Sequence, residues 1–176
     1  NDMNGTPPKV GIILGSASDI PFAKTISETL ELFGVGHEVT VSSAHRTPDA
    51  TVRYAGNAMS RGIGVLICVA GLSAALPGVV AAHTPLPVLG VPVPAGSLGG
   101  LDALLSVAQM PPGVPVASLG IGGAKNAALL ALRILSLEDE RLLAKLTKWT
   151  ENEAEKVARS RASIEDLPSA PEDAFL

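Results

Sequence analysis

KVGIILGSASD, residues 9–19, is the stretch of sequence that decides the fold. Its apolar part, residues 9–14, is rich in β-branched side chains and lies between a proline and a glycine, which predicts a buried strand. Ser18 or Asp19 can cap a helix that follows directly, and Gly34 is placed to end that helix. The segment therefore predicts a strand, a short loop and a helix, which together make the first half of a βαβ unit.

The same alternation of strand and helix continues along the chain. Further strands are predicted at residues 37–42, 63–69, 88–91 and 114–118, and further helices at residues 48–60, 74–82, 98–108, 124–137 and 137–161. Such an alternation favours a parallel sheet covered by helices on both faces, with right-handed crossovers. The predicted fold class is α/β: a three-layer αβα sandwich with a flavodoxin-like or Rossmann-like parallel sheet and a long C-terminal helix.

The chain of 176 residues is long enough for one domain with its own core. No linker or internal repeat divides it, so residues 9–162 are predicted to form a single α/β catalytic domain that includes the C-terminal helix. Residues 1–8 are predicted to be a disordered N-terminal segment. Residues 163–176 are acidic and contain prolines, which predicts a loose tail.

Composition excludes several classes of protein. The formal net charge is −4 and aromatic residues make up 3% of the chain, so neither a basic face nor a stacking surface for nucleic acid is expected. The one cysteine, Cys68, excludes an internal disulfide framework and a cysteine-rich metal site, and no spacing of His, Asp and Glu indicates a metal centre. The polar first residues are unlike a secretion signal, so we expect a cytoplasmic protein.

A long and nearly uncharged stretch occupies the middle of the chain. Asp102 is the single Asp, Glu, Lys or Arg in residues 62–124. Residues 63–82 are apolar enough to resemble a membrane span, but their glycines and prolines argue against one. Two interpretations remain, an unusually apolar core or a homo-oligomer that buries the predicted helices at 74–82 and 98–108. We favour the homo-oligomer, because a single chain of this size has too much surface to hide so many apolar residues.

Three loops follow the first three predicted strands: GSASD at residues 15–19, SAHRTPD at 43–49 and AGLSAALPG at 70–78. Because parallel strands end at the same edge of a sheet, these loops are expected to meet and form a ligand site. The backbone N–H groups and hydroxyls of GSASD suit a phosphate at a helix N-terminus, while Asp19 suits a ligand hydroxyl such as that of a ribose. The alternative interpretation is an ordinary strand–helix turn that binds no ligand, in which Asp19 only caps the helix.

His45 and Arg46 stand side by side in the second loop. An imidazole exchanges a proton near neutral pH, and a guanidinium binds phosphate or carboxylate through its fork of N–H donors. We therefore interpret His45 as an acid–base candidate and Arg46 as an anion ligand, and the alternative is an ordinary surface turn. His37, at the start of a strand, and His83, at the end of a helix, are interpreted as structural.

The third loop is similar in part to the nucleophile elbow of serine hydrolases, with Ser73 at the nucleophile position but without the last glycine of that motif. A hydrolase would need a histidine later in the chain, and His83 follows too closely to reach back to Ser73. We favour instead a wall of small side chains and backbone N–H groups against a flat ligand. Cys68, inside the preceding strand, is interpreted as a buried apolar residue.

The order and spacing of these motifs resemble the aminoimidazole ribonucleotide carboxylases and N5-carboxyaminoimidazole ribonucleotide mutases of purine biosynthesis. The resemblance covers residues 9–150 and includes the three loops, ALPGVVAAHTPLPVLGVPV at 75–93, LDALLSVAQMPPGVPVA at 101–117 and KNAALLALRIL at 125–135. It implies a three-layer α/β fold, usually assembled as a homo-octamer with active sites where subunits meet. It also implies a small ribonucleotide substrate and carbon dioxide as partners, and no metal, biotin or nucleotide cofactor.

The resemblance assigns roles to residues as well. It implies that His45 is the catalytic acid–base residue, and that the loop at 70–78 surrounds the imidazole and the carboxyl group of the substrate. It further implies that Ser16, Asp19 and Arg46 bind the nucleotide. The full set predicted to bind substrate is Gly15, Ser16, Ser18, Asp19, Ser43, Ala44, Arg46, Ala70, Gly71, Ser73, Ala74 and Leu76.

Two reactions are implied, and they differ in the source of one carbon. The mutase moves a carboxylate from the exocyclic nitrogen of the imidazole to ring carbon four, through carbon dioxide released in a closed pocket, and His45 removes the proton from that carbon. The carboxylase adds free carbon dioxide to the same carbon, and this lyase reaction is the alternative.

The third loop departs from the mutase pattern. In typical mutases it reads Gly-Gly-Ala-Ala-His-Leu-Pro-Gly, whereas this chain has Ala75 at the histidine position, and its Gly-x-Ser start with Ser73 is similar to the carboxylase branch. SAHRTPD and the QMPPG segment at 109–113 are similar to the mutase branch. The mutase, an isomerase, is therefore the main interpretation, and a non-catalytic nucleotide-binding protein is a more distant alternative.

Overall fold

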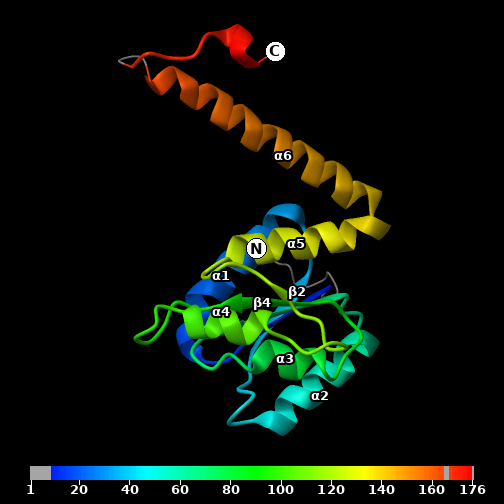
Figure 1. Ribbon diagram of the computed structural model, residues 1–176. Coiled ribbons are helices and arrows are strands. Elements are labelled where there is room, and N and C mark those ends of the chain that lie inside the picture. The colour runs from blue at the N-terminus through cyan, green and yellow to red at the C-terminus, as the bar shows by residue number, and fades with distance from the viewer. Residues whose placement is uncertain (1–8, 165–166, 176) are drawn as a thin grey trace.

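The strands form one parallel sheet with helices on both faces (Figure 1). The computed structural model describes residues 9–164 and 167–175, and the predicted N-terminal segment at 1–8 lies outside them. The strands in these residues are β1 (Val10–Leu14), β2 (His37–Val41), β3 (Val65–Ala70), β4 (Val88–Pro92) and β5 (Ala117–Ser118), in the spatial order β2-β1-β3-β4-β5. The helices are α1 (Ile20–Phe33), α2 (Pro48–Ala58), α3 (Leu76–Ala81), α4 (Leu101–Ala108), α5 (Ala124–Leu135) and α6 (Glu140–Ser160). Short 3-10 helices are η1 (Ala17–Asp19), η2 (Met59–Arg61), η3 (Ser136–Glu138), η4 (Arg161–Ile164) and η5 (Glu172–Phe175).

Two apolar layers hold the helices on the sheet, one on each face. Successive strand residues point to opposite faces, so Ile12 lies in the layer formed with α1 and α5, and Ile13 lies in the layer formed with α2, α3 and α4. β1, β3 and β4 are buried along their whole length, as expected for parallel strands covered on both sides. The predicted three-layer α/β fold is therefore confirmed.

Gly90 allows two helices to approach β4 closely. A Cβ built at this position would overlap the Val107 side chain of α4 and would lie 3.2 Å from Cγ of Pro77 in α3. Any larger residue would push both helices off the strand, which is the usual reason for a glycine inside a buried strand.

β5, α3 and α4 are shorter than the sequence predicts, and each has a backbone reason. β5 lacks the first part of the predicted 114–118 strand, where Pro115 has no N–H group to donate to the sheet. α4 begins later than predicted because Gly100 has a φ angle of 93°, which a right-handed helix does not contain. α3 begins later because the N–H groups of Ala74 and Ala75 donate to carbonyls only two residues back, in turns that precede the helix.

Glu38, Tyr54 and Arg61 join β2 to α2 and η2. The Tyr54 hydroxyl donates to Glu38 Oε1 at 2.6 Å, and the two terminal nitrogens of Arg61 donate to Glu38 Oε2 and Oε1 at 2.9 and 2.5 Å. The Arg61 guanidinium also lies over the Tyr54 ring, 4.9 Å from its centroid. Hydrogen bonding from Arg61 lowers the pKa of Glu38 below its ordinary value, although partial burial acts in the opposite direction.

Replacing Arg61 by glutamine is expected to lower the free energy of unfolding by about 1 kcal/mol or less at neutral pH, since the pair is partly exposed to solvent. The folded-state pKa of Glu38 is depressed, so the stabilisation is complete above the ordinary carboxyl pKa and is lost as the pH falls through the folded value. Thermal melts of wild type and variant from neutral to acidic pH measure this difference in stability. The control is Lys148→Gln, which removes an exposed ion pair with Glu151 within α6. An equal, pH-independent loss of stability in both variants would contradict the role given to the Arg61–Glu38 pair.

α6 docks through its first half. Leu142 and Leu146 are buried in the layer that contains α1 and α5, and the Trp149 ring meets the Phe33 ring edge-on with their centroids 6.3 Å apart. Lys145 Nζ donates to the Phe33 carbonyl at 2.8 Å, which satisfies a free carbonyl at the end of α1. The apolar side chains of this half of the helix therefore pack on their own chain.

The second half of α6 extends away from the body (Figure 1). Its exposed side chains pair along the helix itself, Lys156 with Glu153 at 2.5 Å and Arg159 with Glu155 at 3.9 Å, spacings that stabilise a helix locally. No helix in residues 9–164 and 167–175 is both long and apolar enough to cross a membrane. Residues 165, 166 and 176 of the predicted loose tail lie outside the described residues.

Candidate active site

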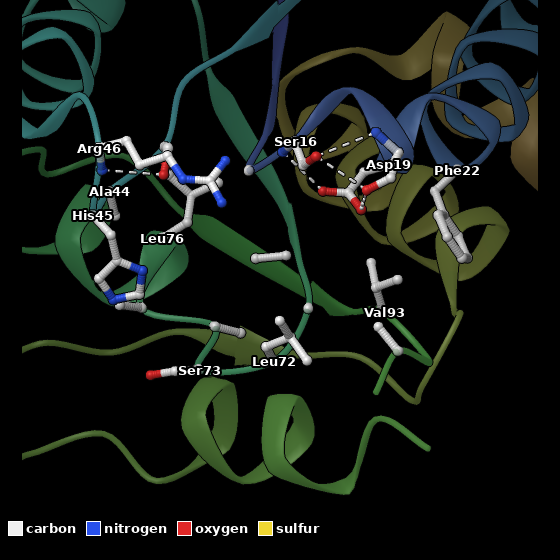
Figure 2. Close-up of a pocket in the computed structure, with 18 of the residues that line it drawn as sticks. Ser16, Asp19, Phe22, Ala44, His45, Arg46, Leu72, Ser73, Leu76 and Val93 are labelled. Carbon is white, nitrogen blue, oxygen red and sulfur yellow. Dashed lines mark hydrogen bonds between the residues drawn. The ribbon is translucent and has the colours of Figure 1, made fainter. Parts of the chain in front are cut away.

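A pocket of about 620 Å³ lies where the loops after β1, β2, β3 and β4 meet (Figure 2). The strand order reverses between β1 and β3, the position at which open parallel sheets bind ligands. The pocket is lined by every residue that the sequence assigns to the site: Gly15, Ser16, Ser18, Asp19, Ser43, Ala44, His45, Arg46, Ala70, Gly71, Ser73, Ala74 and Leu76. The structure thus brings the three predicted loops together, and what these residues bind stays a prediction.

Ser16 and Asp19 fold the first loop into a capping box. The Ser16 hydroxyl accepts from the Ser18 N–H at 3.3 Å, and Asp19 Oδ2 accepts from the Ser16 N–H at 3.0 Å. This box begins η1, and α1 continues from it without a side-chain cap at Asp19. Asp19 stands at the N-cap position of α1, as one of the two predicted caps, but the side-chain cap bond is made by Ser16, because a 3-10 turn precedes the helix.

Asp19 is the buried carboxylate of the pocket, with 4% of its surface exposed. Burial raises the pKa of its carboxyl above the ordinary value, while hydrogen bonds from Ser16 and Ser18 act to lower it. A carboxylate in this position can accept a hydrogen bond from a ligand hydroxyl, and it would repel a phosphate. The N–H groups of Ser16 and Ser18, predicted as phosphate donors, already have partners within the loop.

Hydroxyl groups hold the second loop in shape. The Thr47 hydroxyl accepts from the Ser43 N–H at 2.9 Å and donates to the Ser43 carbonyl at 3.1 Å. The buried hydroxyls of Ser42 and Thr51 lie 2.7 Å apart beneath it, and the Arg46 N–H donates to the Ser43 hydroxyl at 3.2 Å. Thr47 stands at the cap position of α2 but makes no side-chain cap bond, because its hydroxyl serves this loop instead.

His45 and Arg46 are both exposed at the edge of the pocket. Figure 2 shows the Arg46 side chain extending toward the side of Ser16 and Asp19, whereas the His45 ring lies nearer to Ser73. Arg46 is the one Lys or Arg among the lining residues. The pocket therefore offers a fixed positive charge, a buried carboxylate and an imidazole from separate loops, a set able to bind an anionic, hydroxylated ligand and to move a proton on it.

The loops after β3 and β4 form the apolar half of the pocket. The Val93 N–H donates to the Ala70 carbonyl at 2.9 Å, and a Cβ built at Gly71 would lie 3.3 Å from Cβ of Ala95. Ser73 is the polar residue that these loops add to the lining. This half carries no charged side chain, so it suits a flat ring and a small neutral group.

Six lining residues were not predicted as part of the site. They are Phe22, Leu72, Ala75, Val93, Pro94 and Ala95. Leu72 and Ala75 lie within the third predicted loop. Val93, Pro94 and Ala95 follow β4, which ends at the same edge of the sheet as the other strands, so the topology could have indicated these five residues. Phe22 lies in the first turn of α1, one turn after Asp19, and no chemical pattern marks it.

The remaining histidines and the cysteine lie outside the pocket lining. His83 Nδ1 lies 2.8 Å from the Val79 carbonyl at the end of α3, and His37 Nδ1 lies 3.3 Å from the Val35 carbonyl. Cys68 is fully buried, and burial raises the pKa of its thiol. In the part of the chain that the structure describes, no group of three or more His, Cys, Asp and Glu side chains is arranged to hold a metal ion.

The chain is similar to known proteins over most of its length. The family model described as AIR carboxylase matches residues 9–156. The chain is 56% identical over 145 residues to an N5-carboxyaminoimidazole ribonucleotide mutase of Pyrococcus abyssi, covering 82% of this chain and 83% of that protein. It is 50% identical over 163 residues to the protein of the same name in Mycobacterium tuberculosis, covering 93% and 94%. A crystal structure of Treponema denticola PurE superposes with a TM-score of 0.82 at 31% identity, covering 90% of this chain and 99% of that one.

Proposed function

Because the chain belongs to the AIR carboxylase family, we propose that it is an N5-carboxyaminoimidazole ribonucleotide mutase of purine biosynthesis. The observation that carries the proposal is the 56% identity to a relative of that name, supported by a pocket that gathers all the predicted residues. We further propose that it works in the cytoplasm and uses no metal or organic cofactor.

The reaction moves one carbon between two atoms of the same ring. The bond between the exocyclic nitrogen and the carboxylate breaks, that nitrogen takes up a proton, and carbon dioxide is released. Ring carbon four then forms a bond to the carbon dioxide and loses its proton to His45. One proton is taken up and one is given back, so the reaction is an isomerisation and needs no outside reagent.

The two halves of the pocket suit the two halves of this substrate. The Arg46 guanidinium binds the phosphate, and the Asp19 carboxylate accepts hydrogen bonds from the ribose. The apolar half holds the imidazole ring and the one-carbon fragment, where exclusion of water keeps the fragment from being hydrated. Holding both fragments in one pocket replaces an encounter in solution.

Turnover assays with the two carbon donors test the proposal. The protein is supplied either with the carbamate substrate or with aminoimidazole ribonucleotide plus bicarbonate, and the carboxylated product is followed by ultraviolet absorbance. We expect efficient turnover of the carbamate. A protein that forms product from neither donor is not an enzyme of this reaction, and a melting temperature raised by the nucleotide would then favour a non-catalytic binding protein.

Direct carboxylation of aminoimidazole ribonucleotide is a second candidate. Ser73 and Ala75, both in the pocket lining, depart from the typical mutase loop and bring the sequence closer to the carboxylase pattern. If this is the reaction, bicarbonate supports turnover better than the carbamate does. The same pair of assays therefore decides between the two donors.

We also propose that the chain works as a homo-oligomer, an octamer by analogy with its family. Leu98, Leu101 and Leu105 are 60%, 51% and 49% exposed on and just before α4, which leaves an apolar helix face in contact with water. A neighbouring subunit that packs against this face would bury these leucines.

Replacing Leu101 by aspartate is expected to convert the assembly into smaller species, because it places a charge in the apolar contact. Sedimentation or light scattering at micromolar protein concentration measures the size of the assembly. Leu32→Asp, on the exposed side of α1, is the matched control and should leave the assembly intact. A wild-type protein that sediments as a monomer would remove the basis of the proposal.

A further inference from the structure

Leu72 is the one non-glycine residue with a positive φ angle in the part of the chain that the structure describes. Its φ is 54°, a left-handed conformation that is uncommon for a bulky side chain and costs backbone energy. A glycine would adopt the same φ without that cost. Strain of this kind persists where the surroundings require a side chain in one particular place.

The Leu72 side chain lies across the junction between the loops after β3 and β4. A Cβ built at Gly96 would lie 2.8 Å from Cδ2 of Leu72, so the leucine lies directly against the Gly96 backbone. Gly96 itself has a φ of 68°. Figure 2 shows the Leu72 side chain at the edge of the pocket between Ser73 and Val93.

Leu72 remains 55% exposed, although it lines the pocket. The residues beside it on these two loops are smaller, since Gly71, Ala74, Ala75 and Ala95 have at most one side-chain carbon. Leu76 and Val93, the other branched aliphatic residues that these loops add to the lining, are only 2% and 7% exposed, so Leu72 is the one whose side chain is left exposed over this half of the pocket.

We propose that Leu72 is a positioning residue that covers the apolar half of the pocket and retains carbon dioxide there between its release and its capture. This inference rests on the proposed mutase function. The carbon dioxide is freed when the bond to the exocyclic nitrogen breaks and is consumed when ring carbon four bonds to it. Being small, neutral and apolar, it is held by exclusion from water rather than by hydrogen bonds, which is what an aliphatic cover provides.

Retention of an isotope label tests the proposal. The substrate carries ¹³C in its carbamate carbon, the buffer contains unlabelled bicarbonate, and mass spectrometry gives the fraction of product that keeps the label. Wild-type protein should keep most of it. In Leu72→Ala and Leu72→Gly the ratio of lost to retained label should rise about tenfold, the order of effect that removal of a few apolar contacts has on a small bound group. A blank without enzyme measures the spontaneous loss of label, and this loss is subtracted from each enzymatic sample.

Three comparisons separate a cover from a purely structural role. Leu72→Met keeps an aliphatic side chain of similar length and should restore retention, while Leu32→Ala, on the exposed side of α1, should match wild type. The nucleotide KM should change little in the Leu72 variants, because the residue does not face the polar half. A label loss seen only in Leu72→Gly reports a loosened loop backbone and overturns the proposal.

The proposed function and this inference fail in different ways. Wild-type protein that makes no product from the carbamate contradicts the proposed mutase reaction. Wild-type protein that does make product, with the same label retention in Leu72→Ala and Leu72→Gly, contradicts only the role of Leu72.

Discussion

Replacing His45 by asparagine is expected to lower kcat by about a thousandfold, because a positioned acid–base group contributes about 10²–10⁴-fold to a proton transfer. Asparagine keeps the size and polarity of the side chain but cannot accept the proton that leaves ring carbon four. The nucleotide KM should stay near the wild-type value, since the proposed role of His45 is at the ring and not at the phosphate. Steady-state rates with the carbamate substrate measure both constants.

His83→Asn is the matched control for His45→Asn. His83 is exposed at the end of α3, bonds to the Val79 carbonyl and does not line the pocket, so its replacement should leave kcat unchanged. If His45→Asn also retained the wild-type kcat, another group would be moving the proton, and the acid–base assignment would be wrong.

Replacing Arg46 by alanine should mainly weaken substrate binding. A hydrogen-bonded charged pair contributes about 1.5–3 kcal/mol, so KM should rise by roughly ten- to a hundredfold while kcat changes much less. The effect should shrink at high salt, because the guanidinium is exposed and its field is screened.

Arg53→Ala, on the exposed face of α2 and outside the pocket, controls for the loss of a positive charge. Comparison of Arg46→Ala with His45→Asn then tests the division of labour between the two neighbours. Equal losses of kcat and of binding in both variants would show that the loop acts as one unit and that neither residue has a separate task.

Hydrophobic runs and turn residues predict most of this fold. The apolar strands β1 and β3 identify the buried centre of a parallel sheet, and the sheet in turn explains why three distant loops form one site. The helix starts were predicted less well. Residues 16–19 offer several side chains able to cap, and only the three-dimensional path shows that Ser16 does so.

The polar half of the pocket could be predicted, because histidine, arginine and aspartate carry recognisable chemistry. The apolar half was predicted in the loop after β3 but not in the loop after β4. Val93, Pro94 and Ala95 look like any strand end, and their place in the pocket depends on where β4 lies beside β3. The left-handed backbone of Leu72 was also hidden, because leucine is a residue type that seldom adopts it.

The contact between Trp149 and Phe33 has a practical consequence. Trp149 is the sole tryptophan of the chain, and it lies at the junction of α6 with α1, among residues that do not line the pocket. Emission excited selectively from Trp149, and not from Tyr54, therefore reports the docking of the C-terminal helix on α1. Denaturant titrations followed by this emission and by far-ultraviolet circular dichroism would coincide only if that helix leaves the body in the same cooperative step that melts the sheet.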